Sequence, residues 1–456
     1  MARIDRDKLK LQLTQEQQLF VQNHPKSRAA FEKAKSSIFD GVPMPWMTEW
    51  PYPFPIFVRE AAGSRIKDID GREYIDFCLG DTGAMTGHSP KASIDTLIVQ
   101  ARKGLTSMCP TEDAAWVGEE LARRFGLPFW QLAMTATDAN RFCIRLARHI
   151  TGRKKILVYN YCYHGTVDEA MVVLDRGIPV PRKGSIGPPV NPAETTKVIE
   201  FNDPEALEAA LAPGDVACVL AEPAMTNIGI IHPDPGYHQI LREMTRRTGT
   251  LLILDETHTI SAGPGGYTRR HQLEPDILTI GKPIAAGFPA AAYGFSHEVA
   301  DQVRACVGRK KSSASDETGI GGTLSGNAMA MALIKATLQH VLNAAAYAYT
   351  IPLAKRFNQG VQDVIDAWNL PWIVTRLGCR TEYWFCEKPV RSGSEALAAV
   401  DDELDHYMHL GTANRSILMT PFHNMALISP ETTAADVDTH TRVFGELVAA
   451  VITAEG

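Results

Sequence analysis

Several motifs that would define a function are missing from this chain. It has no Gly-x-x-x-x-Gly-Lys-Ser/Thr phosphate loop, no His-Glu-x-x-His pair and no Gly-x-Ser-x-Gly turn. The run Gly263-Pro264-Gly265-Gly266 does not open a helix after a strand, so it is no dinucleotide-binding turn. These absences argue against the commonest nucleotide-binding proteins, zinc proteases and serine hydrolases.

The cysteines also lack a pattern. Eight are scattered along the chain and none forms a Cys-x-x-Cys pair. The spacing therefore predicts neither a zinc site nor a thioredoxin-type centre, and we expect no metal. Cys218 lies within an apolar run, as expected for a small buried residue in a reducing compartment.

Charge and hydrophobicity restrict the partners. The net charge is only −6 and no stripe of Lys and Arg is present, so nucleic acid is not expected as a partner. No apolar stretch approaches the roughly 20 residues of a membrane span, and the N-terminus lacks the apolar core of a secretory signal. We therefore expect a cytoplasmic protein without a membrane partner.

Short apolar runs alternate with helical segments through the middle of the chain. The expected strands are residues 131–134, 155–159, 217–221, 250–255, 277–281 and 291–295. Expected helices between them include residues 140–150 and 236–248. This alternation predicts βαβ units, and hence an α/β fold with a mainly parallel central sheet covered on both faces.

The flanking segments suggest further units. Residues 8–37 are polar and helix-forming, with an interruption at Pro25, and Asp70-Gly71 predicts a hairpin turn within residues 56–78. One long helix is expected over residues 328–346. We predict an N-terminal segment at 1–60 that belongs to a small domain and the active-site entrance, a large domain at 61–344, and an α+β small domain at 345–456.

Two charged residues follow strands of the predicted sheet, where ligands bind in such folds. Asp255 ends the most apolar strand, where an unpaired charge would cost several kcal/mol. Lys282 follows the next strand in an apolar, glycine-rich turn, where desolvation favours the neutral amine. Pyridoxal 5′-phosphate (PLP) enzymes use an aspartate on the pyridine nitrogen and a lysine that forms a Schiff base. The alternatives are a structural aspartate and a solvated lysine.

Other strand ends also carry polar or aromatic residues. Thr135, Ala136 and Thr137 open a helix that either binds an anion or is simply capped by a threonine. Tyr163 follows residues 155–159 and either stacks on a planar ligand or packs in the core. Glu222 follows a buried strand, where a carboxylate is costly unless paired or functional. Pro283 predicts an extended backbone at the preceding lysine.

Taken in order, these segments resemble the class-III aminotransferases, which are PLP-dependent transferases of fold type I. The resemblance covers roughly residues 35–445. It rests on Gly87-His88-Ser89-Pro90, Thr135-Ala136-Thr137-Asp138-Ala139-Asn140, Tyr163-His164-Gly165, Glu222-Pro223, Asp255-Glu256-Thr257, Gly281-Lys282 and Gly322-Thr323-Leu324-Ser325-Gly326-Asn327. Three positions depart from the family pattern: Ala136 replaces a glycine, Thr257 replaces a valine, and Pro283 is unusual after the lysine.

The resemblance implies a role for each matching residue. Lys282 is expected to hold the cofactor and carry protons, and Asp255 to pair with the pyridine nitrogen. The residues expected to bind the rest of PLP in the large domain are Thr135, Ala136, Thr137, Tyr163, His164, Glu222 and Thr257. The resemblance also implies a homodimer with composite sites, in which Thr323 reaches the phosphate in the partner's site.

Substrate binding is predicted less fully. Arg380 is the first candidate for a carboxylate-binding residue, with Arg59 and Arg415 as further candidates, although each is equally an ion-pair partner. Trp46 and the segment Phe422-His423-Asn424 are expected to line an apolar pocket.

The predicted activity is that of an aminotransferase. It moves an amino group from an amine or a β- or ω-amino acid to a keto acid, aldehyde or ketone by a ping-pong mechanism. An aminomutase or racemase, which returns the amino group to the same molecule, is the alternative. A non-catalytic PLP-fold binding protein is a third hypothesis, against which the presence of Lys282 and Asp255 argues.

Overall fold

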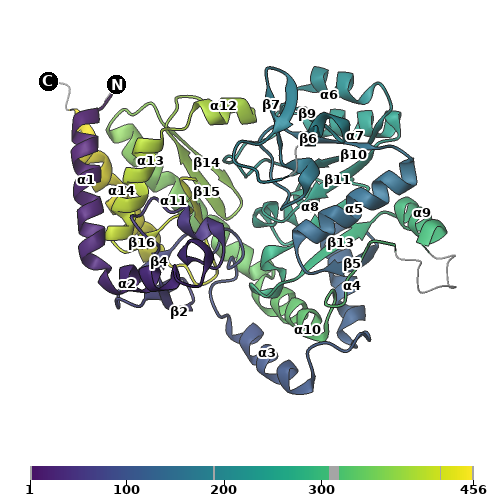
Figure 1. Cartoon of the computed structure of the whole chain (residues 1–456), viewed down its shortest axis with the longest axis horizontal. Helices are drawn as coiled ribbons and strands as arrows, with labels where there is room; N and C mark the ends of the chain where they lie inside the picture. Colours follow the sequence, from purple (N-terminus) through teal and green to yellow (C-terminus); the bar gives the residue numbers. More distant parts are fainter. Residues whose placement is uncertain (1–2, 188–189, 308–317, 422, 454–456) are drawn as a thin grey trace. The chain divides into compact units, whose positions relative to one another are not determined.

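The computed structural model describes residues 3–187, 190–307, 318–421 and 423–453, and the chain divides into two compact units (Figure 1). The sheet unit comprises Lys91–Ala344 and Val390–Ala398, and the terminal unit comprises Met1–Pro90, Ala345–Pro389 and Ala399–Gly456. The domain boundaries predicted at residues 60 and 344 stay predictions.

A seven-stranded sheet forms the centre of the sheet unit, in the order β5-β13-β12-β11-β10-β6-β9. Its strands are β5 (Phe129–Ala133), β6 (Lys155–Tyr159), β9 (Thr196–Ile199), β10 (Val216–Ala221), β11 (Leu251–Asp255), β12 (Ile277–Ile280) and β13 (Ala291–Phe295). Only β13 is antiparallel to its neighbours, β12 and β5. The predicted α/β class with a mainly parallel sheet is confirmed, although the edge strand β9 was not predicted.

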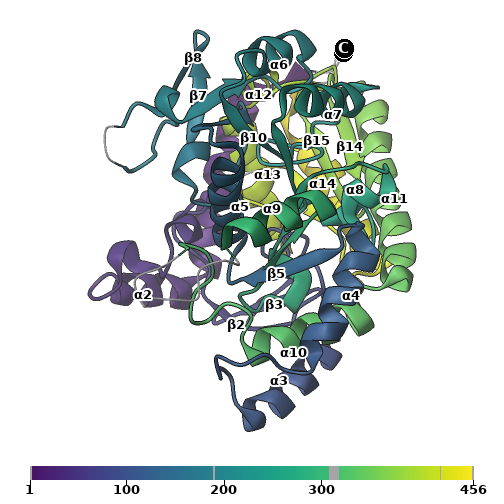
Figure 2. The ribbon, with the colours of Figure 1, turned by 90° about the vertical axis from the view of Figure 1, so that its right-hand side faces the viewer.

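Helices pack on this sheet and explain its apolar strands. α5 (Ala136–Thr151) packs against β5, β10, β11, β12 and β13, and α7 (Tyr237–Thr248) packs against β11. Both helices end at a left-handed glycine, which removes the steric cost of terminating there. Figure 2 shows the sheet unit from the side of β5, with α10 (Ala328–Ala336) beside α3 (Lys91–Lys103).

The predicted long helix over residues 328–346 is wrong. α10 gives way to a π-helical turn at Thr337–Val341, and α11 (Ala344–Ala367) begins after it. The buried guanidinium of Arg124 donates hydrogen bonds to the carbonyl oxygens of Leu338 (2.5 Å) and Leu342 (2.6 Å). These carbonyls therefore bind a side chain instead of continuing the helical ladder.

In the terminal unit, the predicted interruption at Pro25 is confirmed. The chain forms α1 (Arg6–Asn23) and α2 (Pro25–Ala34), and Pro25 is the first residue of α2. α1 packs against α13 (Asp402–Asn414) and α14 (Ala434–Val451). One sheet contains β2 (Val58–Ala62), β3 (Arg65–Asp68), β4 (Glu73–Asp76) and β16 (Ile417–Leu418), and another contains β14 (Ile373–Leu377), β15 (Arg380–Trp384) and β17 (Met425–Leu427).

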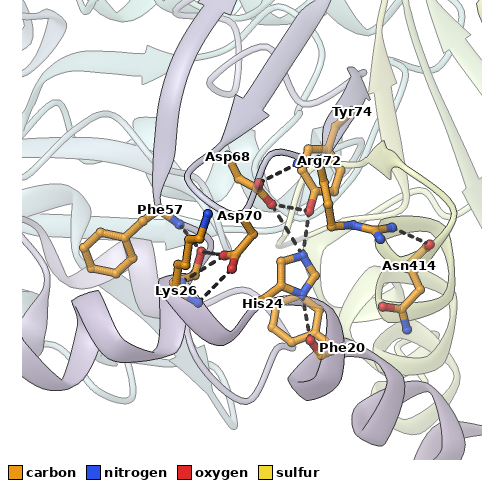
Figure 3. Close-up of polar contacts among 10 residues, drawn as sticks. Phe20, His24, Lys26, Phe57, Asp68, Asp70, Arg72, Tyr74 and Asn414 are labelled. Atoms are coloured by element: carbon orange, nitrogen blue, oxygen red, sulfur yellow. Dashed lines mark hydrogen bonds and ion pairs between the residues drawn. The ribbon is translucent and has the colours of Figure 1, made fainter.

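Hydrogen bonds fix the predicted Asp70-Gly71 turn to α2 (Figure 3). The Asp70 carboxylate accepts hydrogen bonds from the backbone N–H groups of Lys26 (2.7 Å) and Ser27 (2.9 Å). Nearby, the buried ring of His24 lies 2.6 Å from the Tyr74 hydroxyl and 2.7 Å from the Phe20 carbonyl oxygen. A carbonyl oxygen only accepts, so Nδ1 of His24 carries the proton toward Phe20.

An aromatic cage in the terminal unit encloses another histidine. The ring of His440, on α14, stacks on Phe357 with a centroid distance of 4.1 Å and meets the edge of Phe77 at 5.7 Å. Neither ring nitrogen has a hydrogen-bond partner among the described residues. Burial lowers the pKa of His440 to about 3, so the folded protein holds this imidazole in its neutral form near neutral pH.

We predict that His440→Leu makes the protein more resistant to acid. The unfolded chain protonates this histidine near pH 6.5 and the folded chain only near pH 3, so wild-type stability is lost as the pH falls below about 6.5. Between pH 7 and pH 5, the unfolding free energy of the variant should gain about 2 kcal/mol relative to wild type. Denaturant titrations followed by circular dichroism measure this difference.

The matched control is His406→Leu, since His406 is exposed on α13. The difference in unfolding free energy between this control variant and wild type should be the same at pH 7 and pH 5. If the difference in unfolding free energy between His440→Leu and wild type is the same at pH 7 and pH 5, His440 takes up its proton equally in the folded and unfolded chains.

Candidate active site

Polar residues collect at one edge of the seven-stranded sheet. β10, β11 and β12 are parallel, so Glu222, Asp255 and Lys282 lie at the edge where these strands end. β5 runs in the same direction as β12, because β13 is antiparallel to both. A methyl group built on Gly281 would lie 3.0 Å from the Cβ of Ala136, which places the start of α5 beside the lysine turn.

The carboxylate of Asp255 is held by three donors. Oδ2 accepts from Nδ1 of His164 (3.0 Å) and Nδ2 of Asn140 (2.9 Å), and Oδ1 accepts from the backbone N–H of Thr257 (3.0 Å). Burial alone would raise the pKa of Asp255, but these hydrogen bonds and the charge of His164 lower it to about 2. Asp255 therefore presents a fixed negative charge at the sheet edge.

His164 carries the compensating positive charge. Burial would lower the pKa of His164, but the neighbouring Cys162 and the Asp255 carboxylate raise it to about 10. Asn140 orients the pair, because its amide also donates to the His164 carbonyl oxygen (3.1 Å) and its Oδ1 accepts from the hydroxyl of Thr279 (2.7 Å). His164 and Asp255 thus form a buried, hydrogen-bonded ion pair.

Glu222 is a second buried carboxyl group at this edge. Its oxygens accept from the hydroxyl and the backbone N–H of Thr226, the latter at 3.1 Å. Burial raises the pKa of Glu222 to about 7, against the opposing effects of the His164 charge and of the Thr226 hydrogen bonds. The pKa of Glu222 therefore lies near neutral pH.

Lys282 lies in a strained turn. Its φ of +45° is in the left-handed region, which is unfavourable for a residue with a side chain by roughly 1–3 kcal/mol. The extended backbone predicted from Pro283 is wrong, because Lys282 begins a 3-10 turn (Lys282–Ala285) closed by the Ala286 N–H to Pro283 carbonyl bond at 3.1 Å. Nζ of Lys282 lies 2.8 Å from Nε2 of His258.

The hydrogen bonds at the start of α5 match the alternative in which a threonine caps the helix. The hydroxyl of Thr135 accepts from the Asp138 N–H at 3.2 Å and donates to its carboxylate at 2.9 Å. Oγ1 of Thr137 accepts from the Thr166 N–H at 3.1 Å. A Cβ on Gly165 would collide with this oxygen, so glycine is required where the two loops meet. The first-turn N–H groups of a helix still attract anions, and Ala136 is the first residue of this one.

Three further predicted cofactor residues occupy different environments. Tyr163 is half-buried beside His164 in the chain. The hydroxyl of Thr257 is buried and has no hydrogen-bond partner among the described residues. Thr323 is exposed, which is compatible with a contact outside its own chain.

The predicted substrate residues all lie in the terminal unit. Arg380 is completely buried; it lies 2.7 Å from Sδ of Met425 and bonds the Thr82 hydroxyl. Nη1 of Arg415 donates to Oε1 of Glu16 at 2.8 Å.

Arg59 is exposed on β2, and Trp46 is 40% exposed on the turn Pro45–Thr48. Substrate binding by these four residues stays a prediction, and Phe422 lies outside the described residues.

The sequence prediction assigned no role to two residues of the site, Asn140 and His258. Asn140 had a detectable pattern, since it falls on the apolar inner face of α5, where a polar side chain needs partners. His258 had none, because its contact with Lys282 depends on how the segments after β11 and β12 fold toward each other. Among the described residues, no group of three His, Cys, Asp or Glu side chains could hold a metal ion.

The sequence profile of the family Aminotransferase class-III matches residues 47–375. The chain belongs to this family. A glutamate-1-semialdehyde-aminomutase from Pseudomonas aeruginosa PAO1, solved in complex with PMP, is 46% identical, with 98% of this chain and 99% of that chain covered and a TM-score of 0.96. Glutamate-1-semialdehyde 2,1-aminomutase of Methanosphaera stadtmanae is 32% identical over 91% of this chain and 96% of its own length.

A further solved structure supports fold type I. The β-phenylalanine aminotransferase from Variovorax paradoxus has a TM-score of 0.85 at 24% identity, with 97% of each chain covered. No helix in the described ranges is both long enough and apolar enough to cross a membrane.

PLP is the cofactor of this class-III enzyme, and the residues at the sheet edge fit it. The fixed charge of Asp255 suits a protonated pyridine nitrogen, and the N-terminus of α5 suits a phosphate. The buried hydroxyl of Thr257 lacks a partner within the described chain, as expected beside a polar ligand.

We predict that Glu222→Gln stabilises the cofactor-free protein at alkaline pH. The pKa of Glu222 is higher in the folded chain than in the unfolded one, so the wild type loses stability as the pH rises and this carboxyl group must ionise inside the protein. From pH 5 to pH 9 the variant should gain about 2–3 kcal/mol relative to wild type in denaturant titrations. The control variant Glu205→Gln changes an exposed residue and should show no such gain in unfolding free energy. If the difference in unfolding free energy between Glu222→Gln and wild type is the same at pH 5 and pH 9, the raised pKa of Glu222 is contradicted.

Proposed function

We propose that the protein is a PLP-dependent aminomutase of the glutamate-1-semialdehyde 2,1-aminomutase type. The observation that carries this proposal is the 46% identity over 98% of the chain to a glutamate-1-semialdehyde-aminomutase, together with the curated relative of the same activity. Aminotransfer to an external acceptor, the activity first predicted from the sequence, is supported only by membership of the family. The alternative from the sequence analysis is therefore the better-supported function.

In this proposal the residues at the sheet edge bind the cofactor. Lys282 forms the covalent link through Nζ, and Asp255 pairs with the pyridine nitrogen. Thr135, Ala136 and Thr137 hold the phosphate, Tyr163 and Thr257 flank the ring, and His164 and Glu222 complete the cofactor-binding set. When bound, PLP accepts electrons from a bond to the substrate carbon that bears nitrogen. Lys282 then takes and returns a proton at the substrate carbon as general base and acid.

The proposed quaternary structure is a homodimer with composite sites. The exposed Thr323 would reach the phosphate in the partner's site. Arg380 is our first candidate for the substrate carboxylate because it is buried and bidentate recognition suits arginine. Arg415 is a weaker candidate because Glu16 already pairs with it. Arg59 is a further candidate for the carboxylate, and Trp46 for the wall of an apolar substrate pocket. A cytoplasmic location stays a prediction.

The first test uses glutamate-1-semialdehyde without any keto acid. An aminomutase converts it to 5-amino-4-oxopentanoate, which contains the same atoms, so the holoenzyme should complete many turnovers per site, as followed by mass spectrometry. An aminotransferase would stop after about one turnover per site and resume on addition of a keto acid. β-Phenylalanine with and without a keto acid is the matched control substrate.

A second prediction concerns the covalent link. Borohydride reduction of the holoenzyme should add the mass of the reduced cofactor to the peptide that contains Lys282, and Lys282→Ala should lose this adduct. Because Lys282 also moves the proton, the variant should lose at least about 10²-fold in kcat. Lys335→Ala is the control, since Nζ of Lys335 bonds Oδ1 of Asp113 at 2.7 Å. An adduct on another lysine would overturn the role of Lys282.

A further inference from the structure

A histidine outside the predicted site contacts the reactive lysine. Nε2 of His258 lies 2.8 Å from Nζ of Lys282. The two residues come after β11 and β12, which are neighbouring parallel strands of the sheet, and both side chains are partly exposed. His258 directly succeeds the Asp255-Glu256-Thr257 motif, so it lies three residues from the proposed pyridine partner.

Each of the two residues lies at the start of a 3-10 turn. His258 precedes the 3-10 turn Thr259–Ala262, and its carbonyl oxygen accepts from the Ser261 N–H at 3.2 Å. Lys282 is held in its left-handed conformation at the start of the turn after β12. A residue with a side chain keeps such a conformation only where the surrounding structure imposes it.

The nearby carboxylates are already engaged. Asp255 binds His164 at 3.0 Å, and Glu256 accepts from the Thr259 hydroxyl at 2.5 Å and the Tyr267 N–H at 3.0 Å. The Lys282–His258 contact itself joins two basic groups.

Two bases at 2.8 Å share one proton more easily than they hold two. An ammonium group donates to a neutral imidazole nitrogen, or a neutral amine accepts from an imidazole N–H, whereas two cations at this distance repel. Transfer breaks the N–H bond on Nζ, forms an N–H bond on Nε2 and moves the positive charge from lysine to histidine. The lysine nitrogen becomes a nucleophile without losing its proton to bulk water.

We infer that His258 is a positioning residue for Lys282, which holds its Nζ at the sheet edge and exchanges one proton with it. This inference rests on the assignment of Lys282 as the reactive lysine. It does not depend on whether the reaction is an isomerisation or an aminotransfer, so its first test needs no substrate.

The test follows the imidazole of His258 by NMR. Full-length protein without cofactor is labelled with [13Cε1]histidine, and the His258 signal is assigned by its loss in His258→Gln. In the wild type, the lysine ammonium opposes a second proton on the pair. Lys282→Met should therefore raise the pH at which His258 is half protonated by about one unit, a tenfold change in proton affinity.

Two internal controls are available. Lys335→Met, which removes a lysine elsewhere in the sheet unit, should leave the His258 titration unchanged. The exposed His297 should titrate identically in every variant. If Lys282→Met leaves the His258 midpoint where it is in the wild type, the pair shares no proton and the inference is overturned.

A second measurement separates proton exchange from packing. His258→Ala should bind the cofactor but lose about 10- to 100-fold in kcat, and added imidazole should restore part of this loss, because a free base can occupy the vacated position. His258→Gln, which keeps polar contact but carries no proton at neutral pH, should show low kcat with little change in KM. A wild-type kcat in His258→Gln, or no recovery of His258→Ala with imidazole, would show that His258 only fills space.

Discussion

The negative charge of Asp255 is the constraint on which the site depends. A carboxylate at the end of a buried strand is tolerated only when it is paired and hydrogen-bonded. His164 supplies the paired charge, while Asn140 and the Thr257 backbone supply further donors. This requirement accounts for the histidine that follows β6 and for the polar side chain on the inner face of α5. The same arrangement keeps one charge permanently available to a cationic ring nitrogen.

Much of the sheet was predictable because burial imposes a simple pattern on central strands. β6 and β13 match the predicted ranges, and β10 and β11 differ from them by one residue at the start. The edge strand β9 was not predicted because Thr196-Lys197-Val198-Ile199 is short and includes a charged residue. The break after α10 was not predicted because the guanidinium that binds the carbonyl oxygens there belongs to Arg124, which lies far away in the sequence.

The candidate site was predictable to the extent that strand ends mark ligand sites. Asp255, Lys282, Glu222 and the start of α5 were found from their positions alone. Strand ends do not reveal which side chains reach across between loops, so His258 was missed. The local rule about proline also failed at Lys282, whose backbone is left-handed although the residue before a proline prefers an extended conformation.

The left-handed backbone of Lys282 has a consequence for the evolution and engineering of this protein. A lysine there is less stable than a glycine would be, because only glycine adopts a φ of +45° without steric cost. Folding and chemistry therefore prefer different residues at this single position. A library selected for heat resistance alone should accumulate glycine at position 282, so thermal selection would need a functional screen alongside it to keep the enzyme active.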